Sequence, residues 1–242
     1  MKQTRSRRLK LPSSLDYHLK SIGHRAFLNA GRRATPMQLA SLRSMLTYLE
    51  LGHWLASEHP QARPLMVNYD FALFEVAHRH IVGRAPLYLE FGVWEGRSMR
   101  WWSRNLTQPD ATLVGFDSFE GLPEDWRPGY SAGQFRTGKP PHIDDSRVSF
   151  QVGWFDETLP RFEVPDHDQM IINVDSDLYS SAATVLGWAE PYLRPGTLIY
   201  FDEFCDRDHE VRAFNDFRAK SQYQFEPLGI ARGGTNWLFE VS

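Results

Sequence analysis

Five short runs of mostly apolar residues recur in the second part of the chain, and they limit the folds that it can adopt. They cover residues 87–91, 112–116, 147–152, 170–174 and 197–201. Apolar runs of this length are typical of parallel strands that helices cover on both faces. The segment 180–193, between the fourth and fifth runs, has the length of a helix. The pattern therefore predicts a doubly wound, mostly parallel α/β sheet.

The end of the chain predicts two more strands. Residues 223–230 and 235–241 are rich in apolar and aromatic residues, and Arg232-Gly233-Gly234 lies between them. Two strand patterns joined by a short glycine-rich turn predict a hairpin. We therefore expect a seven-stranded sheet with a closing C-terminal hairpin.

The part of the chain before the first apolar run has a helical pattern. Thr35 can cap a helix that begins at Pro36, and apolar residues follow at steps of three and four. A second helical run, from Phe71 to Ile81, closes at Gly83, a residue that favours helix ends. The sequence therefore predicts two helices that precede the strands of the sheet along the chain.

This change of pattern suggests two parts. We expect a basic tail and helical cap over 1–85 and one domain over 86–242. Within the domain, the stretch 122–146 is rich in proline and glycine and is the longest loop that we expect. Long loops in compact domains often act as lids, and we predict that role for 122–146.

The composition excludes several classes of protein. A net charge of -3 gives no field that attracts nucleic acid, and the basic first ten residues are interpreted as a solvated tail. No apolar stretch approaches the roughly 18 residues of a membrane span. Cys205 is the only cysteine, so no intrachain disulfide can form. We expect a cytoplasmic protein that binds neither nucleic acid nor a membrane.

A glycine turn follows the first strand, in the segment 90–98 (EFGVWEGRS). Gly92 and Gly96 leave room for a ligand to approach the backbone, and the helix that follows offers free N–H groups. The spacing lacks the third glycine of the dinucleotide fingerprint and the lysine of a phosphate-binding loop. The turn therefore suits a cofactor other than a phosphate, or it only makes a tight bend between strand and helix.

Acidic residues stand at the ends of three other predicted strands. Asp117 ends the second strand, where a carboxylate can accept hydrogen bonds from both hydroxyls of a ribose, or can simply begin a solvated turn. Two acidic clusters, 174–177 (VDSD) and 201–204 (FDEF), follow the fourth and fifth strands. Carboxylates directly after an apolar strand suit a divalent cation or a base.

Four motifs in this order resemble those of the macrocin O-methyltransferase family, whose members are class I S-adenosylmethionine enzymes of natural-product tailoring. They are 90–98, 115–123 (GFDSFEGLP), 153–160 (GWFDETLP) and 174–179 (VDSDLY). The similarity covers roughly 85–242. It implies a Rossmann-like class I methyltransferase fold.

The resemblance implies an S-adenosylmethionine site made from these motifs. The residues that it places there are Glu90, Phe91, Gly92, Ser98, Asp117, Ser118, Phe119, Gly153, Trp154, Phe155 and Asp175. Glu90, Gly92 and Ser98 would surround the methionine end, and Asp117 would hold the ribose. Trp154 or Phe155 would complete the adenine pocket, although aromatic residues after a strand also commonly pack into the core.

The resemblance also implies a Mg2+ site made by Asp175, Asp202 and Glu203. Mg2+ prefers oxygen ligands and keeps several waters, which leaves positions for hydroxyl oxygens of a substrate. The chain departs from the family at Ser176, where glycine is usual, and at Glu203, where aspartate is frequent. Glu203 keeps the charge but extends one methylene further.

Two residues are candidates for the base that removes a proton from the substrate. Asp175 lies in the acidic cluster itself, and His142 lies in the predicted lid. Asp177 is interpreted instead as a residue at the start of a helix, because carboxylates are stabilising there.

The function that we predict is transfer of a methyl group from S-adenosylmethionine to a hydroxyl of a small molecule, with Mg2+. The acceptor is expected to be a sugar or another polyol-like group of a secondary metabolite. The alternatives are an NAD-dependent oxidoreductase, against which the missing third glycine argues, and a non-catalytic cofactor-binding protein. The aromatic residues and N-terminal helices also suit a homodimer.

Overall fold

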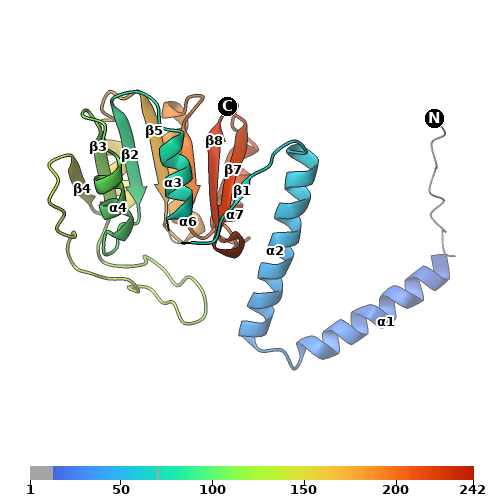
Figure 1. Ribbon diagram of the computed structural model, residues 1–242. Helices are drawn as coiled ribbons and strands as arrows, with labels where there is room; N and C mark the ends of the chain where they lie inside the picture. The colour runs from blue at the N-terminus through green and yellow to red at the C-terminus, as the bar shows by residue number, and fades with distance from the viewer. Residues whose placement is uncertain (1–12, 70) are drawn as a thin grey trace, which may run out of the picture. The chain divides into compact units, whose positions relative to one another are not determined.

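A computed structural model describes residues 13–69 and 71–242 of the chain (Figure 1). The predicted basic tail lies outside the described residues. The chain divides into two compact units, Met1–Leu42 and Arg43–Ser242. The second unit contains the sheet together with the end of the helical region that precedes it.

Two long helices, α1 (Ser13–Gly31) and α2 (Pro36–Glu58), come first in the described chain. Helix α2 begins where the sequence predicts. The Thr35 hydroxyl accepts a hydrogen bond from the Gln38 amide at 3.3 Å, and the Gln38 side chain accepts one from the Thr35 amide at 2.9 Å. These two reciprocal bonds form a capping box, which satisfies two N–H groups at the helix end.

The apolar residues that recur along the predicted helix, Leu39, Leu42, Met45, Leu46 and Leu49, do not form the buried face of α2. Leu51 and Trp54 are buried, whereas Met45, Leu46 and Leu49 are exposed, Leu49 by 71%. The reason is that Trp54 packs against aromatic rings of the sheet domain, at 6.3 Å from Phe214 and 6.0 Å from Phe239 between ring centroids. The large indole surface determines which side of the helix faces the domain.

The sheet has eight strands among the described residues, in the order β1-β7-β8-β6-β5-β2-β3-β4 (Figure 1). The strands are β1 (Leu65–Met66), β2 (Pro86–Phe91), β3 (Thr112–Asp117), β4 (Val148–Val152), β5 (Gln169–Val174), β6 (Leu198–Phe201), β7 (Phe225–Ala231) and β8 (Asn236–Val241). All neighbouring pairs are parallel except those of β8, which runs antiparallel to β6 and β7. The predicted parallel strands and closing hairpin are confirmed. The sequence missed β1, whose two residues are too few to show a pattern.

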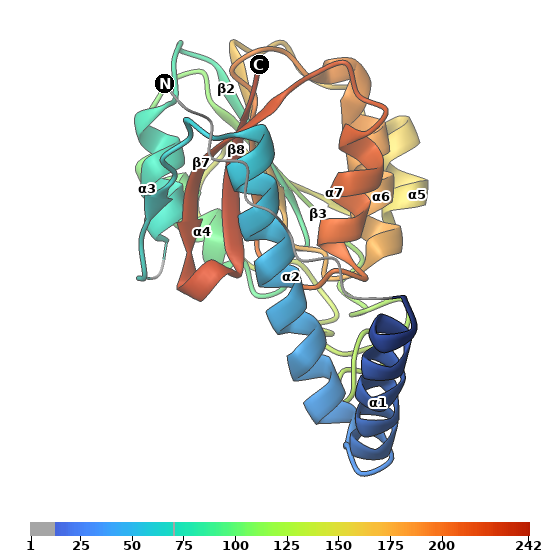
Figure 2. The same ribbon diagram turned by 90° about the vertical axis from the view of Figure 1, so that its right-hand side faces the viewer.

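Helices cover both faces of this sheet (Figure 2). Helices α3 (Ala72–Arg79) and α4 (Arg97–Asn105) lie on one face, and α5 (Phe155–Thr158), α6 (Tyr179–Ala189) and α7 (Glu210–Arg218) lie on the other. Short 3-10 segments cover Leu159–Arg161, Glu190–Tyr192 and Arg232–Gly234. No helix of the described residues is long and apolar enough to cross a membrane.

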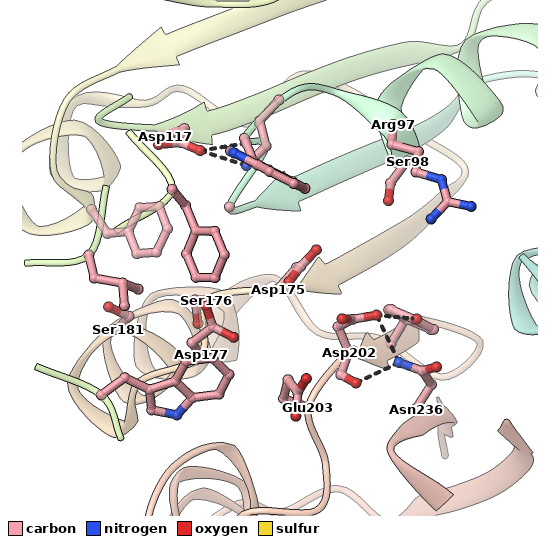
Figure 3. Close-up of a pocket in the computed structure, with 18 of the residues that line it drawn as sticks. Arg97, Ser98, Asp117, Asp175, Ser176, Asp177, Ser181, Asp202, Glu203 and Asn236 are labelled. Atoms are coloured by element: carbon pink, nitrogen blue, oxygen red, sulfur yellow. Dashed lines mark hydrogen bonds between the residues drawn. The ribbon is translucent and has the colours of Figure 1, made fainter. Parts of the chain in front are cut away.

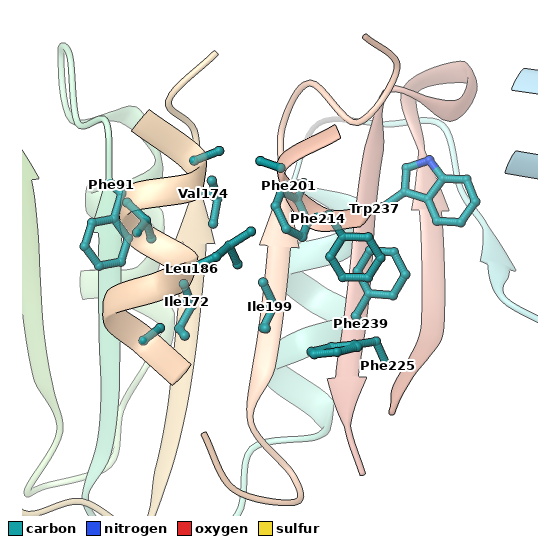
Figure 4. Close-up of a cluster of buried hydrophobic side chains, with 14 of the residues drawn as sticks. Phe91, Ile172, Val174, Leu186, Ile199, Phe201, Phe214, Phe225, Trp237 and Phe239 are labelled. Carbon is teal, nitrogen blue, oxygen red and sulfur yellow. The ribbon is translucent and has the colours of Figure 1, made fainter. Parts of the chain in front are cut away.

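Each face of the sheet has its own apolar core. Side chains alternate along a strand, so β2 sends Leu89 and Phe91 to one core and Tyr88 to the other. The first core joins α6 and α7 to the sheet through rings such as Phe214 and Phe239 (Figure 4). Burying each large apolar side chain contributes about 1.5–3 kcal/mol, so these two cores hold the strand ends rigidly.

Strand register brings the predicted motifs to one edge of the sheet. Phe91 pairs with both Phe116 and Val174, and Val174 pairs with Phe201. Because these strands are parallel, the residues that follow each of them emerge side by side. The chain between β3 and β4, residues 118–147, contains no helix and borders this edge.

Candidate functional site

A cavity of about 930 Å³ opens at the carboxyl ends of the parallel strands. Its walls come from the turn after β2, the ends of β3, β5 and β6, and the loop after β3 (Figure 3). Of the residues predicted from the sequence, those that line it are Gly92, Ser98, Asp117, Ser118, Gly153, Trp154, Phe155, Asp175, Asp202 and Glu203. The fold therefore brings the four motifs around one space.

The remaining predicted residues do not line this cavity. Phe91 is fully buried and stacks on Phe116, with 4.8 Å between ring centroids. Phe119 is buried against Phe150. His142 lies in the loop after β3 with an exposed side chain. Glu90 is buried behind the cavity.

The glycine turn after β2 is shaped by close contact with β5. Gly92 has a φ of 94°, and a side chain on it would collide with the backbone carbonyl of Asp175. Gly96 also has a positive φ, and a side chain there would meet Pro141. Only glycine combines this conformation with so little space. The tight bend thus brings the backbone at Gly92 directly against the first acidic cluster.

Asp117 joins the glycine turn to the end of β3. Its Oδ2 atom accepts hydrogen bonds from the amides of Val93 and Trp94, both at 2.8 Å (Figure 3). Its Oδ1 atom accepts one from the Phe119 amide at 2.7 Å. A carboxylate offers about four acceptor positions, so these three bonds leave about one for a ligand. Contact with two hydroxyls of a ligand would therefore require the turn to release at least one of its bonds.

Four carboxyl groups of the two acidic clusters line the cavity. Asp175, Asp202 and Glu203 lie around the same space, with Asp177 beside them (Figure 3). Burial, together with the negative charges of Asp202 and Asp177, raises the pKa of Asp175 well above its ordinary value. Burial and the charges of Glu203 and Asp202 raise the pKa of Asp177 to about 7. Beyond the effect of burial, these pKa values rise because the carboxylates repel one another and little positive charge lies near enough to offset the repulsion.

Asp202 and Glu203 are held by different partners. Asp202 Oδ1 accepts hydrogen bonds from the Tyr200 hydroxyl at 2.8 Å and the Asn236 amide at 2.7 Å. Glu203 lies 3.7 Å from the guanidinium of Arg127, measured between Oε2 and Nη1. Burial raises the pKa of Glu203, and Arg127 opposes that rise. Asp202 is thus held by two hydrogen bonds, while Glu203 lies near Arg127 of the loop after β3 and accepts a hydrogen bond from the Cys205 thiol at 3.5 Å.

The oxygen atoms of these carboxylates are suitable ligands for a hard cation, but their side chains are not assembled around one point. Within residues 13–69 and 71–242, no group of three or more His, Cys, Asp or Glu side chains is already arranged to hold a metal ion. Cation binding would lower the raised pKa values, because it supplies the missing positive charge. It would also require side-chain rotations toward a common point.

Glu90 is the most unusual carboxyl group behind the cavity. It is 1% exposed, and it accepts a hydrogen bond from the Tyr88 hydroxyl at 2.8 Å. Burial raises its pKa to about 8, against the opposing effect of the Tyr88 hydrogen bond, and the charges of Asp117 and Asp202 add to the rise. In this structure Glu90 therefore carries a proton at neutral pH.

The structure adds three residues that the sequence did not place in the site. Asp177, interpreted as a helix-start residue, precedes α6 but also lines the cavity, with a φ of 61°. Arg127 stacks on Trp126, with 3.6 Å from its guanidinium carbon to the ring centroid. Glu210, at the start of α7, is fully buried behind the two acidic clusters. Tertiary packing brings Glu210 to this place, so no local sequence motif predicts its contact with the clusters.

Comparison with known proteins shows similarity to methyltransferases. The model of a methyltransferase domain family matches residues 89–204. Demethyldecarbamoylnovobiocin O-methyltransferase of Streptomyces niveus is 27% identical over 170 residues, which are 62% of this chain and 64% of that protein. The 8-demethyl-8-(2,3-dimethoxy-alpha-L-rhamnosyl)-tetracenomycin-C 4'-O-methyltransferase of Streptomyces olivaceus is 29% identical over 150 residues, 51% of this chain and 57% of that protein. The chain thus spans less than two thirds of the length of either relative.

A solved structure supports the same fold. The crystal structure of CalS11, a calicheamicin methyltransferase, aligns with a TM-score of 0.55 at 20% identity, over 86% of this chain and 93% of that one. The chain therefore has the Rossmann-like fold of class I methyltransferases, as predicted. The matched segment 89–204 contains the glycine turn, Asp117, Asp175, Asp202 and Glu203.

Proposed function

We propose that this protein transfers a methyl group from S-adenosylmethionine to a hydroxyl group of a small molecule. The observation that carries the proposal is that the segment matching a methyltransferase domain supplies the glycine turn, Asp117 and the carboxylates, and that these line one cavity. The match favours this activity over the nicotinamide-dependent oxidation that we considered from the sequence. The resemblance to macrocin O-methyltransferases points the same way.

The cofactor is proposed to lie along the carboxyl ends of β2 and β3. The methionine end would lie at the turn beginning with Gly92 and reach Ser98 at the start of α4, because the first N–H groups of a helix have no partner within the helix. Asp117 would accept a hydrogen bond from the ribose. Trp154 and Phe155, which line the cavity after β4, would contact the adenine. This placement directs the sulfonium group toward Asp175, since Gly92 lies against the backbone of that residue.

The chemistry that this geometry serves is a direct displacement. The acceptor hydroxyl loses its proton to a base, and an oxygen lone pair forms a bond to the sulfonium methyl carbon. The carbon–sulfur bond breaks, and its electrons remain on sulfur, which leaves a neutral thioether. We assign the proton to Asp175, which lies in the cavity beside the glycine turn, rather than to the exposed His142. The protein's main contribution is alignment of the two reacting atoms.

We also propose that Asp175, Asp202 and Glu203 hold Mg2+ when the enzyme works. The proposal is supported by their oxygen donors, by their position around one space, and by the raised pKa values of Asp175 and Glu203. A bound Mg2+ would supply positive charge that favours loss of the hydroxyl proton. Tyr200 and Asn236 would orient Asp202 through the hydrogen bonds described above.

The acceptor that we propose is a sugar hydroxyl of a secondary metabolite. This rests on the relative whose name specifies a rhamnosyl tetracenomycin, and on a structural neighbour described as a TDP-rhamnose 3'-O-methyltransferase, with a TM-score of 0.50 at 22% identity. The cavity of about 930 Å³ has room for both cofactor and sugar.

The test is methyl transfer from labelled S-adenosylmethionine to a panel of deoxysugar nucleotides and glycosylated aglycones, followed by mass spectrometry. We expect one acceptor class to gain a methyl group, and EDTA to abolish the gain. Cofactor binding without transfer to any member of the panel would favour the non-catalytic alternative. Transfer that is unchanged by EDTA would remove Mg2+ from the proposal and leave the activity standing.

A further inference from the structure

We propose that Glu210 is a positioning residue, which holds the two acidic clusters at the distance that lets their side chains act on one cation. This inference rests on the proposed function, because it concerns the same Mg2+ site. Glu210 is the first residue of α7 and does not line the cavity. It acts on the site through the backbone of the two clusters.

The two carboxyl oxygens of Glu210 each accept a hydrogen bond from a turn that follows a strand, so this side chain links the two turns; we call this link the bracket. Its Oε1 atom accepts a hydrogen bond from the Ser176 amide at 3.3 Å, in the turn after β5. Its Oε2 atom accepts one from the Glu203 amide at 3.1 Å, in the turn after β6. The side chain is 0% exposed, so water does not compete for either bond. One carboxyl group thus connects the two segments that carry every proposed ligand.

A second contact from α7 supports the same connection. His209, which precedes Glu210, accepts a hydrogen bond from the Tyr179 amide at 3.3 Å through Nδ1. Between the two anchored amides lies Asp177, a non-glycine residue with a φ of 61°. This left-handed conformation costs most residues about 1–2 kcal/mol and aspartate less, and contacts from another segment can offset the cost. The start of α7 provides that support on both sides of Asp177.

Independent evidence indicates that the bracketed turn faces a ligand. Ser176 is 8% exposed and lines the cavity, and its Oγ atom has no hydrogen-bond partner among the described residues. A buried hydroxyl normally has a partner, because leaving it unpaired costs about 1–3 kcal/mol. Oxygen ligands from a cation's water shell or from a substrate would satisfy it.

A simpler role for Glu210 is to stabilise its own helix, since acidic residues at a helix start do so. That role alone would not place both oxygens on amides of two other segments. The two roles also differ in what a substitution changes. Loss of helix stabilisation lowers the stability of the protein. Loss of the bracket separates the proposed metal ligands and lowers the affinity for Mg2+.

The test compares Mg2+ and cofactor-product binding by calorimetry in the full chain. In Glu210→Gln the amide oxygen accepts one N–H, while the amide NH2 faces the other N–H, donor against donor. We expect Mg2+ binding to the protein loaded with S-adenosylhomocysteine to weaken by about 10–100-fold. Affinity for S-adenosylhomocysteine should fall much less, because Asp117 and Ser98 lie on segments to which Glu210 forms no hydrogen bond.

Two further variants make the result decisive. Glu226→Gln is the matched control, because Glu226 is an exposed residue of β7 whose carboxylate pairs with His59 at 3.1 Å, and it should leave both affinities unchanged. Glu210→Asp keeps a carboxylate at the helix start but is one methylene too short to reach both amides. It should weaken Mg2+ binding as Glu210→Gln does, and it serves if Glu210→Gln does not fold.

Three results would overturn the inference, and they differ in which of the other proposals they also reject. Wild-type Mg2+ affinity in both Glu210 variants would reject the bracket alone. Equal losses of Mg2+ and S-adenosylhomocysteine binding would show a general structural role. Absence of Mg2+ binding by the wild-type protein would reject the proposed metal site together with the bracket, and the methyl-transfer proposal would then depend on the cofactor measurement.

Discussion

The raised pKa of Glu90 should make the folding stability of the protein depend on pH. Glu90 is buried, and its pKa is raised from 4.5 to about 8 in the folded protein. In the unfolded chain the group is solvated and titrates near its ordinary value. Between these two pH values the folded state binds about one more proton than the unfolded state. Stability must therefore fall as pH rises through this window.

The magnitude follows from the width of the window. A difference of one bound proton changes stability by about 1.4 kcal/mol per pH unit, so up to about 5 kcal/mol is lost between pH 4.5 and pH 8. Glu90→Gln removes the titration and keeps an oxygen that can accept the Tyr88 hydrogen bond. Its new amide donors are buried, which can cost about 1–3 kcal/mol at every pH. The variant should thus be less stable than wild type near pH 5 and more stable near pH 8.5.

The assay is thermal unfolding of the cofactor-free protein at these two pH values. For a chain of this size, 1 kcal/mol shifts the midpoint by about 2–4 °C, so the variant's midpoint relative to wild type should rise by on the order of 10 °C between them. Glu163→Gln, at an exposed position, is the control and should show no such rise. An equal difference between Glu90→Gln and wild type at both pH values would refute the reasoning, because it would mean that Glu90 is ionised in the folded protein.

Other substitutions test the turn and the carboxylates separately. Gly92→Ala should destabilise the protein by about 1–3 kcal/mol or more in chemical denaturation, because its methyl group meets the backbone of Asp175; Gly187→Ala, a helical glycine with no atom within 4 Å of the added carbon, should be neutral or stabilising. Asp117→Asn should weaken S-adenosylhomocysteine binding by about tenfold or more in calorimetry, since a charged acceptor is lost; an unchanged affinity would exclude Asp117 from the cofactor site. Asp202→Asn should weaken Mg2+ binding without altering cofactor-product affinity, and equal Mg2+ isotherms for variant and wild type would exclude Asp202 as a ligand.

The sheet could be predicted from the sequence because its strands are apolar on both faces. The run 170–174 matches β5 to within one residue, and 112–116 matches β3 equally well. Parallel pairing then fixes which strand ends are neighbours, so the gathering of Asp117, Asp175 and Asp202 at one edge followed from the pattern. Periodicity was a weaker guide for α2, where burial of Trp54 selected a different face.

The supporting contacts of the site could not be predicted in this way. Glu210 reaches Ser176 across 34 positions of the chain, and Arg127 approaches Glu203 from the loop after β3. Such pairs depend on how helices and loops pack, and the two residues have no fixed spacing in the sequence by which they could be recognised. The positive φ of Asp177 is likewise a result of tertiary contacts. Local motifs therefore identify the residues facing the cavity better than those that hold them in place.

The cavity at the carboxyl edge of the sheet is proposed to bind S-adenosylmethionine. Titration of the wild-type chain with S-adenosylhomocysteine in a calorimeter tests it most directly, because it requires neither the acceptor nor a cation. We expect saturable binding of one ligand per chain, which Asp117→Asn weakens. No heat and no rise of the unfolding midpoint at millimolar ligand would contradict it, because a ligand that binds the folded state must stabilise it.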